Sequence, residues 1–467
     1  MPPPRLSAVD ASFLYLEQAR TPMHVGAVAI FRAPEGGFDY DHLVETVERR
    51  LVRVPRYRQR VRRVPGNLAR PVWVDDADFD VTFHVRRSAL PRPGTELQLS
   101  ELVARLMSRP LDHDRPLWEL YLVEGLSDGR FAVITKTHQA MVDGVNTIDI
   151  GQVLLDPTPH PVDVPDRVWM PRPEPSDVQL VTDAVAEAVG RPGQVIDAVR
   201  HATNDAVAQA SRVVRGVGEL VGAMLPGGRL APGSPLNVDV STQRRFAVAR
   251  SPLESYREVR AVHGCTVNDV VLAVITGALR SWLLSRGEPV TAASRVRALV
   301  PLWTRPDSGP PDGRVRSTLV DLPVGESSPT LRLRHVAHAM TEHTAGGRTV
   351  RAGTLAVIGG YAPPTLHALG ARAVSGISKR IFNVVVTNVP GPQVPLYAAG
   401  ARLIEMFPVV PLVQGQGLAI GVTSYDGGLF YGLTGDRDAM SDVDLLAGMI
   451  GESLDELRAT PHTRSGA

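Results

Sequence analysis

Apolar and polar residues in the N-terminal third of the chain follow the periods of both strands and helices. Residues 25–32 (VGAVAIFR) and 131–137 (FAVITKT) are short runs rich in β-formers that follow turn-forming residues, which predicts two strands. In residues 41–53 and 99–107, the large apolar side chains recur every three or four positions, which predicts amphipathic helices. We therefore expect residues 1–155 to form a mixed α/β domain.

The composition of the chain changes after residue 156. Prolines are dense between Pro157 and Pro175, which favours an extended connection. Ser176 and Gln179 then predict a capping box at the start of a helix. Residues 194–225 continue as a weakly amphipathic stretch of mostly alanine and valine. We expect residues 156–236 to be a proline-rich and helical linker, with its helices packed between two domains.

Residues 237–467 have the pattern of a second α/β domain. Thr266 and Asp269 predict another capping box, which opens a strongly periodic helix that extends to about residue 283. The turn Tyr425-Asp426-Gly427 predicts a hairpin between the last two strands. The fold class is thus α/β, with two similar domains that each hold an open mixed sheet. The predicted strands are 296–302, 317–323, 382–387, 417–424 and 428–433.

Composition and charge narrow the function classes. Hydrophobic residues make up 43% of the chain and charged residues 21%, as in ordinary globular proteins. With 50 basic and 49 acidic residues and no basic block, we expect no nucleic-acid partner. Cys265 is the only cysteine, which excludes an internal disulfide and a thiolate zinc site. We expect a cytoplasmic protein, because the N-terminus has no signal-peptide pattern and no run of about 18 apolar residues occurs.

The segment from His138 to Gly144 (HQAMVDG) is the strongest candidate for chemistry. A histidine stands where a predicted strand ends, and an Asp-Gly turn begins five residues later, at Asp143. Such a histidine can act as a general base near neutral pH, with the aspartate fixing the local geometry. By itself this pattern is more often structural, because a histidine before a turn is commonly a satisfied polar residue.

The surrounding sequence strengthens the functional interpretation. HQAMVDG resembles the HHxxxDG signature of the bacterial wax ester synthase/diacylglycerol acyltransferase family, which is related to chloramphenicol acetyltransferase and to peptide-synthetase condensation domains. Further segments resemble elements of that family in the same order along the chain. They are LSAVDASF (6–13), PMHVG (22–26), RPLWE (115–119), TVND (266–269) and TNVPGP (387–392).

This resemblance implies an acyltransferase whose active-site channel runs between the two domains. A fatty acyl-CoA would donate its acyl group to diacylglycerol or a long-chain alcohol, with triacylglycerol the favoured product. The resemblance implies no cofactor beyond the acyl-CoA co-substrate, no metal and no covalent acyl-enzyme. Because such substrates partition into membranes, we expect peripheral association with the inner membrane face or lipid droplets.

The sequence departs from the family motif at the position of its base. The family's second histidine is replaced by Gln139, and His138 holds the first-histidine position. A glutamine amide cannot take up a proton near pH 7. Three readings follow. His138 could serve in the channel, Gln139 could orient the acceptor hydroxyl, or the fold could bind acyl-CoA or lipid, or regulate an active relative, without catalysis.

The remaining motif residues have structural and substrate-binding interpretations. Asp143 is implied to hold the motif loop in place. Asn268, Thr387 and Asn388 are candidates for substrate binding, since a Ser or Thr hydroxyl where the strand ends in a Pro-Gly turn could hydrogen-bond a developing oxyanion, and the resemblance implies this use for Thr387 or Asn388. The other motif positions are expected to be structural, as core packing, a helix cap or a turn. They are Pro116, Leu117, Trp118, Asp269, Pro390 and Gly391.

Overall fold

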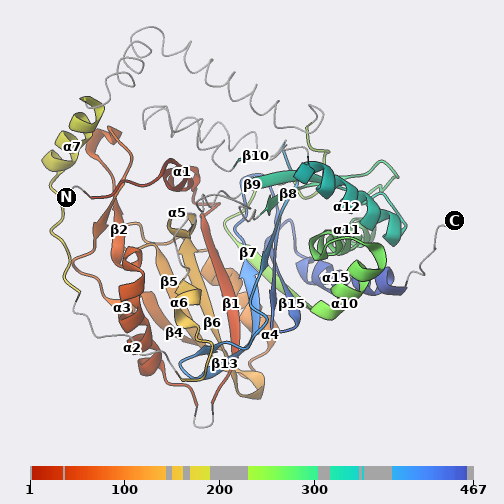
Figure 1. Ribbon diagram of the computed structural model, residues 1–467, viewed down its shortest axis with the longest axis horizontal. Helices are drawn as coiled ribbons and strands as arrows, with labels where there is room; N and C mark the ends of the chain where they lie inside the picture. Colours follow the sequence, from red (N-terminus) through yellow and green to blue (C-terminus); the bar gives the residue numbers. More distant parts are fainter. Residues whose placement is uncertain are drawn as a thin grey trace, which may run out of the picture.

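Two α/β halves lie side by side in the computed structural model (Figure 1). The structure describes residues 3–34, 37–142, 150–160, 169–189, 230–302, 316–345, 350–351 and 381–459. Each half contains one mixed sheet, six-stranded in the first half and seven-stranded in the second. The predicted fold class is therefore confirmed.

The first sheet has the strand order β12-β13-β1-β6-β5-β4. Its two central strands are β1 (His24–Arg32) and β6 (Arg130–His138), which pair antiparallel along their whole length. On one face of the sheet, Lys136 of β6 donates a hydrogen bond to the Arg109 carbonyl, just after helix α4. On the other face, Trp118, which pairs with the next β6 residue, Thr137, donates to the Tyr57 carbonyl. Helices therefore cover both faces. Strands β4 (Val85–Ala89) and β5 (Trp118–Leu126) also belong to this sheet, whereas β2 (Gln59–Arg62) and β3 (Val72–Asp75) pair with each other in a separate two-stranded sheet. The helices of this half are α1 (Ala8–Leu16), α2 (Tyr40–Arg50), α3 (Val81–His84), α4 (Glu96–Met107), α5 (Gln139–Val142) and α6 (Ile150–Leu154).

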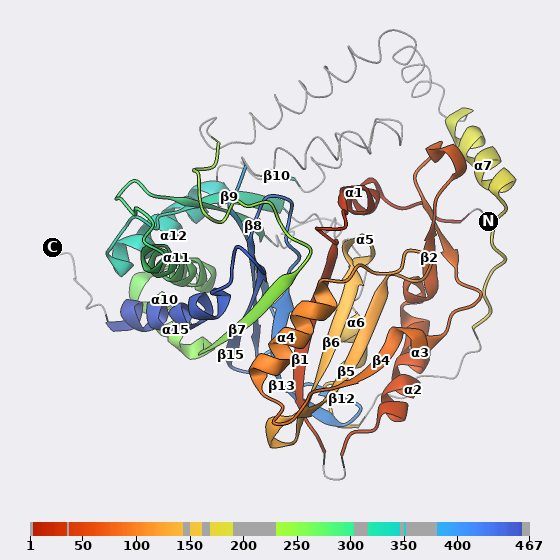
Figure 2. The same ribbon diagram turned by 180° about the vertical axis from the view of Figure 1, so that it is seen from behind.

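The second sheet has the order β10-β9-β8-β11-β14-β15-β7. Strand β11 is parallel to both of its neighbours, and the remaining pairs are antiparallel. The described helices of this half gather on its outer side (Figure 2). The elements are β7 (Arg244–Pro252), α10 (Leu253–His263), α11 (Val267–Ser285), β8 (Val296–Leu302), β9 (Arg316–Leu322), α12 (Pro329–Ala345), β10 (Val350–Arg351), β11 (Val384–Pro390), β14 (Leu418–Tyr425), β15 (Gly428–Asp436) and α15 (Val443–Ala459).

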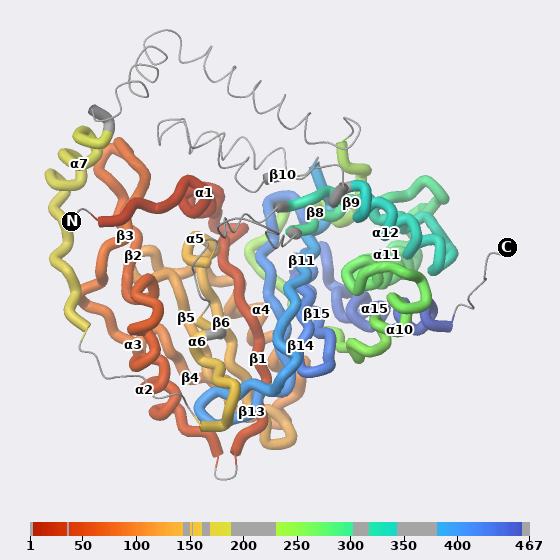
Figure 3. Tube along the Cα trace, viewed as in Figure 1, coloured from red at the N-terminus to blue at the C-terminus, as the bar shows by residue number. Residues whose placement is uncertain are grey.

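Strands β12 (Tyr397–Ala398) and β13 (Ala401–Val409) follow β11 in sequence but complete the first sheet, where β13 pairs with β1 (Figure 3). The chain thus crosses from the second half to the first and back. Near the end of β13, Pro408 lies against two paired glycines, Gly421 of β14 and Gly432 of β15. A Cβ at Gly432 would stand 1.9 Å from the Pro408 carbonyl oxygen, so only glycine permits this approach.

Most of the predicted elements are confirmed to within a few residues. Helix α11 spans nearly the predicted range, and the hairpin between β14 and β15 turns at Asp426 and Gly427, both with positive φ. Among the described helices, α11 alone is long and apolar enough to cross a membrane by length and composition. Most of its apolar window, 72%, is buried inside the protein, as expected of a core helix.

The described part of the linker departs from its predicted position. The capping box is present, since Gln179 N–H donates to Ser176 Oγ and Ser176 N–H donates to Gln179 Oε1, and it opens helix α7 (Asp177–Val189). However, α7 packs Leu180 and Ala184 against β3 at the outer edge of the first half rather than between the halves. The buried face of α7 finds its apolar partners at that edge. Arginines of β2 also pair there with acidic residues around the start of α7. Residues 194–225 lie within a segment outside the described residues.

Candidate active site

The histidine motif starts where β6 passes into α5. His138 is the last residue of the strand and Gln139 the first of the helix. Backbone hydrogen bonds from both residues tie this transition to Leu117 and Met23, across 2.9 and 2.8 Å. The side chain of His138 is fully buried, whereas Gln139 is only partly buried. Asp143 and Gly144, the other two candidates of the motif, lie outside the described residues.

Both ring nitrogens of His138 face the protein interior. The Ala140 backbone N–H donates a 3.0 Å hydrogen bond to Nδ1. Because Nδ1 accepts this bond, a neutral His138 must carry its proton on Nε2. Nε2 lies 3.6 Å from Glu17 Oε2 and has no hydrogen-bond partner within the described residues. In this arrangement neither nitrogen is available to accept a proton from a substrate hydroxyl, which argues against His138 as a replacement base.

Glu17 is a site residue that the sequence reasoning missed. Its Oε2 lies 2.7 Å from His113 Nε2, and its Oε1 accepts a 3.0 Å hydrogen bond from the Met23 backbone N–H. Burial by itself raises the pKa of Glu17, but the hydrogen bonds from His113 and Met23, together with the nearby ring of His138, hold it well below the usual range. The carboxylate is therefore charged. The available signal was the position of Glu17 between the two N-terminal segments that resemble the family, 6–13 and 22–26.

Glu17, His113 and His138 place three possible metal-ligand atoms within 4.8 Å of one another. The chemistry of His138 does not fit a metal ion there. A neutral histidine that binds a metal through Nε2 carries its proton on Nδ1 and donates it to a second-shell acceptor. In His138 the Nδ1 atom instead accepts a hydrogen bond from a backbone N–H. The cluster is better described as a carboxylate shared by two histidines.

The second half brings two of the predicted substrate-binding residues together. Asn388, on β11, donates a hydrogen bond from Nδ2 to Oδ1 of Asn268 in the first turn of α11, across 3.0 Å. Both side chains are partly buried, and Thr387 lies next to Asn388 on the same strand. Asp269 forms the predicted capping box with Thr266 and is thereby occupied. The hydrogen bond between the two amides involves neither the Asn268 N–H₂ group nor the Asn388 side-chain oxygen, so both can face a ligand.

The turn after β11 packs closely against β14. The Gly391 N–H donates to Ser424 Oγ across 3.3 Å, and a Cβ at Gly391 would lie 2.3 Å from the Ser424 carbonyl oxygen. Pro390 is the exposed last residue of β11. This geometry supports the structural interpretation of Gly391, because the turn can approach β14 only where a side chain is absent. The structural interpretation of Pro390 stays a prediction.

Pro116, Leu117 and Trp118 lead into β5 and are all buried. The Trp118 indole Nε1 donates to the Tyr57 carbonyl across 2.7 Å, and its ring stacks on His84 with centroids 4.6 Å apart. These contacts agree with the interpretation of the segment as part of the core of the first half. They also fix the position of β6, since the His138 N–H donates to the Leu117 carbonyl.

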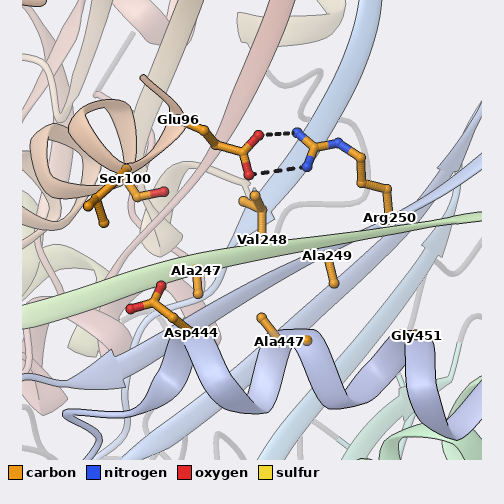
Figure 4. Close-up of a pocket in the computed structure, with 11 residues that line it drawn as sticks. Glu96, Ser100, Ala247, Val248, Ala249, Arg250, Asp444, Ala447 and Gly451 are labelled. Atoms are coloured by element: carbon orange, nitrogen blue, oxygen red, sulfur yellow. Dashed lines mark hydrogen bonds and ion pairs between the residues drawn. The ribbon is translucent and has the colours of Figure 1, made fainter. Parts of the chain in front are cut away.

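A groove of about 520 Å³ lies between α4, β7 and α15, and it contains none of the site residues predicted from the sequence (Figure 4). Arg250 of β7 projects toward α4 and bonds to both carboxylate oxygens of Glu96, and it also pairs with Glu405 of β13 at 2.8 Å. This ion-pair cluster joins three segments from the two halves. The cluster therefore links the two halves through ion pairs.

The arrangement of two linked α/β halves is also found in solved structures of condensation domains and of a wax ester synthase/diacylglycerol acyltransferase. The fold is shared with the first condensation domain of the calcium-dependent antibiotic synthetase, with a TM-score of 0.59 at 16% identity over 98% of this chain and 96% of that one. It is also shared with the wax ester synthase/diacylglycerol acyltransferase of Marinobacter aquaeolei VT8. That comparison gives a TM-score of 0.65 at 30% identity over 97% of this chain and 98% of the other.

Sequence comparison identifies the family. Residues 6–271 match the model of the wax ester synthase/diacylglycerol acyltransferase catalytic domain, and residues 313–458 match that of the WS/DGAT C-terminal domain. A probable diacylglycerol O-acyltransferase of Mycobacterium tuberculosis, tgs3, is 50% identical over 264 residues, which cover 56% of this chain and 97% of the relative. The chain belongs to the wax ester synthase/diacylglycerol acyltransferase family and is an acyltransferase of that type.

Proposed function

We propose that the protein transfers a fatty acyl group from acyl-CoA to the free hydroxyl of diacylglycerol, forming triacylglycerol and CoA. The family assignment over both halves carries this proposal, and the mycobacterial relative's name supports diacylglycerol over a long-chain alcohol as the acceptor. The acceptor oxygen forms the new ester bond to the thioester carbonyl carbon, and the bond from that carbon to the CoA sulfur breaks. The hydroxyl proton ends on the CoA thiol.

Gln139 stands where the family motif has its proton-accepting histidine, and in this proposal it orients the acceptor hydroxyl instead. Its amide oxygen can accept a hydrogen bond from the acceptor hydroxyl, and its amide nitrogen can donate to the developing oxyanion. Orientation of this kind lowers the barrier without moving a proton to the enzyme. The buried and occupied ring of His138 supports this second reading over the one in which His138 acts as the base.

Peripheral contact with a lipid surface belongs to the same proposal, since diacylglycerol resides in membranes and lipid droplets. Three large apolar side chains on or just before α7 are strongly exposed: Met170, Val178 and Val185 are 81%, 72% and 51% exposed. Side chains of this kind can enter the interfacial region of a bilayer. Co-sedimentation with vesicles that contain diacylglycerol, compared with a Met170→Ser/Val178→Ser variant, tests this contact.

The release of CoA from oleoyl-CoA tests the proposed reaction. Release is measured with and without diacylglycerol for the natural protein and for Gln139→His. We expect slow acceptor-dependent release from the natural protein and an increase of about 10²–10⁴-fold in Gln139→His, the usual contribution of a general base. Gln393→His places a histidine on the exposed turn after β11 and is the matched control.

Each outcome has a distinct meaning. Acceptor-dependent release by Gln139→His alone would show that the natural chain retains the scaffold without the chemistry, contrary to the proposal. Much faster esterification of hexadecanol than of diacylglycerol would make wax esters the product.

A further inference from the structure

A carboxylate next to a histidine decides which of the two neutral tautomers the ring adopts. Glu17 Oε2 faces Nε2 of His138, and the side chain of His138 is fully buried. A negative charge at this distance favours the tautomer with the proton on Nε2, since the N–H dipole then points toward the carboxylate. In that tautomer Nδ1 keeps its lone pair, which accepts the hydrogen bond from Ala140 N–H.

The Ala140 N–H lies in the first turn of α5, where helical N–H groups have no partner within the helix. The bond to His138 Nδ1 satisfies one of these groups. Since Gln139 lies between the two bonded residues, the bond also restrains the backbone that carries the Gln139 side chain. In the opposite tautomer an N–H on Nδ1 would point at the Ala140 N–H, and the first turn would have to move.

Resting on the proposed function, we propose that Glu17 is a positioning residue for acyl transfer, which holds His138 as the Nε2–H tautomer and thereby fixes the first turn of α5 and Gln139. Glu17 is well suited to this role because its own position is determined from two other sides. Its Oε1 is held by the Met23 N–H, and its Oε2 is held by His113.

Glu17→Gln is the direct test. The amide oxygen of glutamine can keep the Met23 hydrogen bond, which turns its N–H₂ group toward the two histidines. His138 Nε2 then becomes an acceptor, and the ring moves its proton to Nδ1. We expect kcat to fall roughly 10- to 100-fold, as for a misplacement of about 1 Å, with KM for oleoyl-CoA changed less than about twofold.

A double-mutant cycle distinguishes positioning through His138 from a general structural effect. In His138→Asn, the side-chain Oδ1 can accept the Ala140 N–H in place of Nδ1, and asparagine has no tautomers. We therefore expect Glu17→Gln to have no further effect on kcat in the His138→Asn background. An equal loss of kcat in both backgrounds would overturn the proposal, because Glu17 would then act by another route.

Nitrogen NMR of ¹⁵N-histidine-labelled protein gives a readout that does not require turnover. We expect a protonated Nε2 and an unprotonated Nδ1 for His138 in the natural protein, and the reverse in Glu17→Gln. His113→Gln, which removes the other histidine from Glu17, should leave the His138 tautomer unchanged. An Nε2–H tautomer that persists in Glu17→Gln would refute the proposal, whereas an absence of acceptor-dependent CoA release would refute only the proposed function.

Discussion

The side-chain amide of Asn388 donates a hydrogen bond to the side-chain oxygen of Asn268 across 3.0 Å. The bond joins the end of a central strand to the first turn of the longest buried helix of the second half, α11. Neither residue is needed for a helix cap, because Thr266 and Asp269 already provide one. Two polar side chains that hold each other at the end of a strand are suited to binding a ligand.

The first prediction concerns this pair. Asn388→Ala should lower kcat by about 10²–10³-fold if the amides stabilise the oxyanion of the tetrahedral intermediate, with a smaller change in KM for oleoyl-CoA. Steady-state release of CoA measures both constants. Gln393→Ala is the control, since Gln393 bonds to Gly391 and Ser424 on the adjacent turn. A loss of less than about threefold in Asn388→Ala would assign the pair a structural role only.

The second prediction contrasts two glycines. In Gly432→Ala the new Cβ would clash with the Pro408 carbonyl oxygen, so the contact between β13 and the second sheet should open and the melting temperature should fall. At Gly448, within α15, an added Cβ meets no atom within 4 Å. Gly448→Ala should therefore stabilise the protein by about 0.5–1 kcal/mol through helix propensity. Equal effects of the two substitutions on thermal unfolding would show that Pro408 does not restrict position 432.

The third prediction concerns a buried ion pair in the first half. Arg50 and Asp156 lie 2.5 Å apart with side chains 2% and 4% exposed, and Arg50 also donates to the carbonyls of Val153 and Leu154. Arg50→Met leaves Asp156 charged and unpaired, which should cost about 3–5 kcal/mol in the free energy of unfolding. Denaturant unfolding measures the loss. Arg49→Met, at an exposed pair on the same helix, should cost no more than about 1 kcal/mol.

The fourth prediction concerns stability in mild acid. Burial, reinforced by the charge on Lys136, lowers the pKa of His24 to about 3, and burial lowers the pKa of His84 to about 4. Below pH 6.5 the unfolded chain takes up protons at these histidines while the folded protein does not. The free energy of unfolding should therefore fall with decreasing pH, by up to about 1.4 kcal/mol per unit for each histidine.

Unfolding measured between pH 7 and 4.5 tests this slope. His24→Gln should make the slope shallower, and His42→Gln, at an exposed position, should leave it unchanged. A slope unaffected by His24→Gln would mean that His24 gains its proton in the folded state as well.

The elements of the two sheets could largely be predicted because their signals are local. The strands around Val28, Ile134 and Ile420 alternate or run apolar within a few residues, and the caps at Ser176 and Thr266 are short motifs that form the same hydrogen bonds in many helices. The family motifs are local in the same way, and they allowed the acyltransferase activity to be predicted from the sequence. The position of Gln139 and its chemical consequence could be read directly from the sequence.

What required the tertiary structure are the contacts between residues far apart in the chain. No local pattern indicates that β13 leaves the second half to pair with β1, because the choice of a partner strand depends on residues far away in the chain. Likewise, the sequence identifies Glu17, His113 and His138 only as separate polar residues. Folding brings them into one cluster around the buried His138, and we propose that the shared carboxylate and a single backbone N–H determine the tautomer of His138 there.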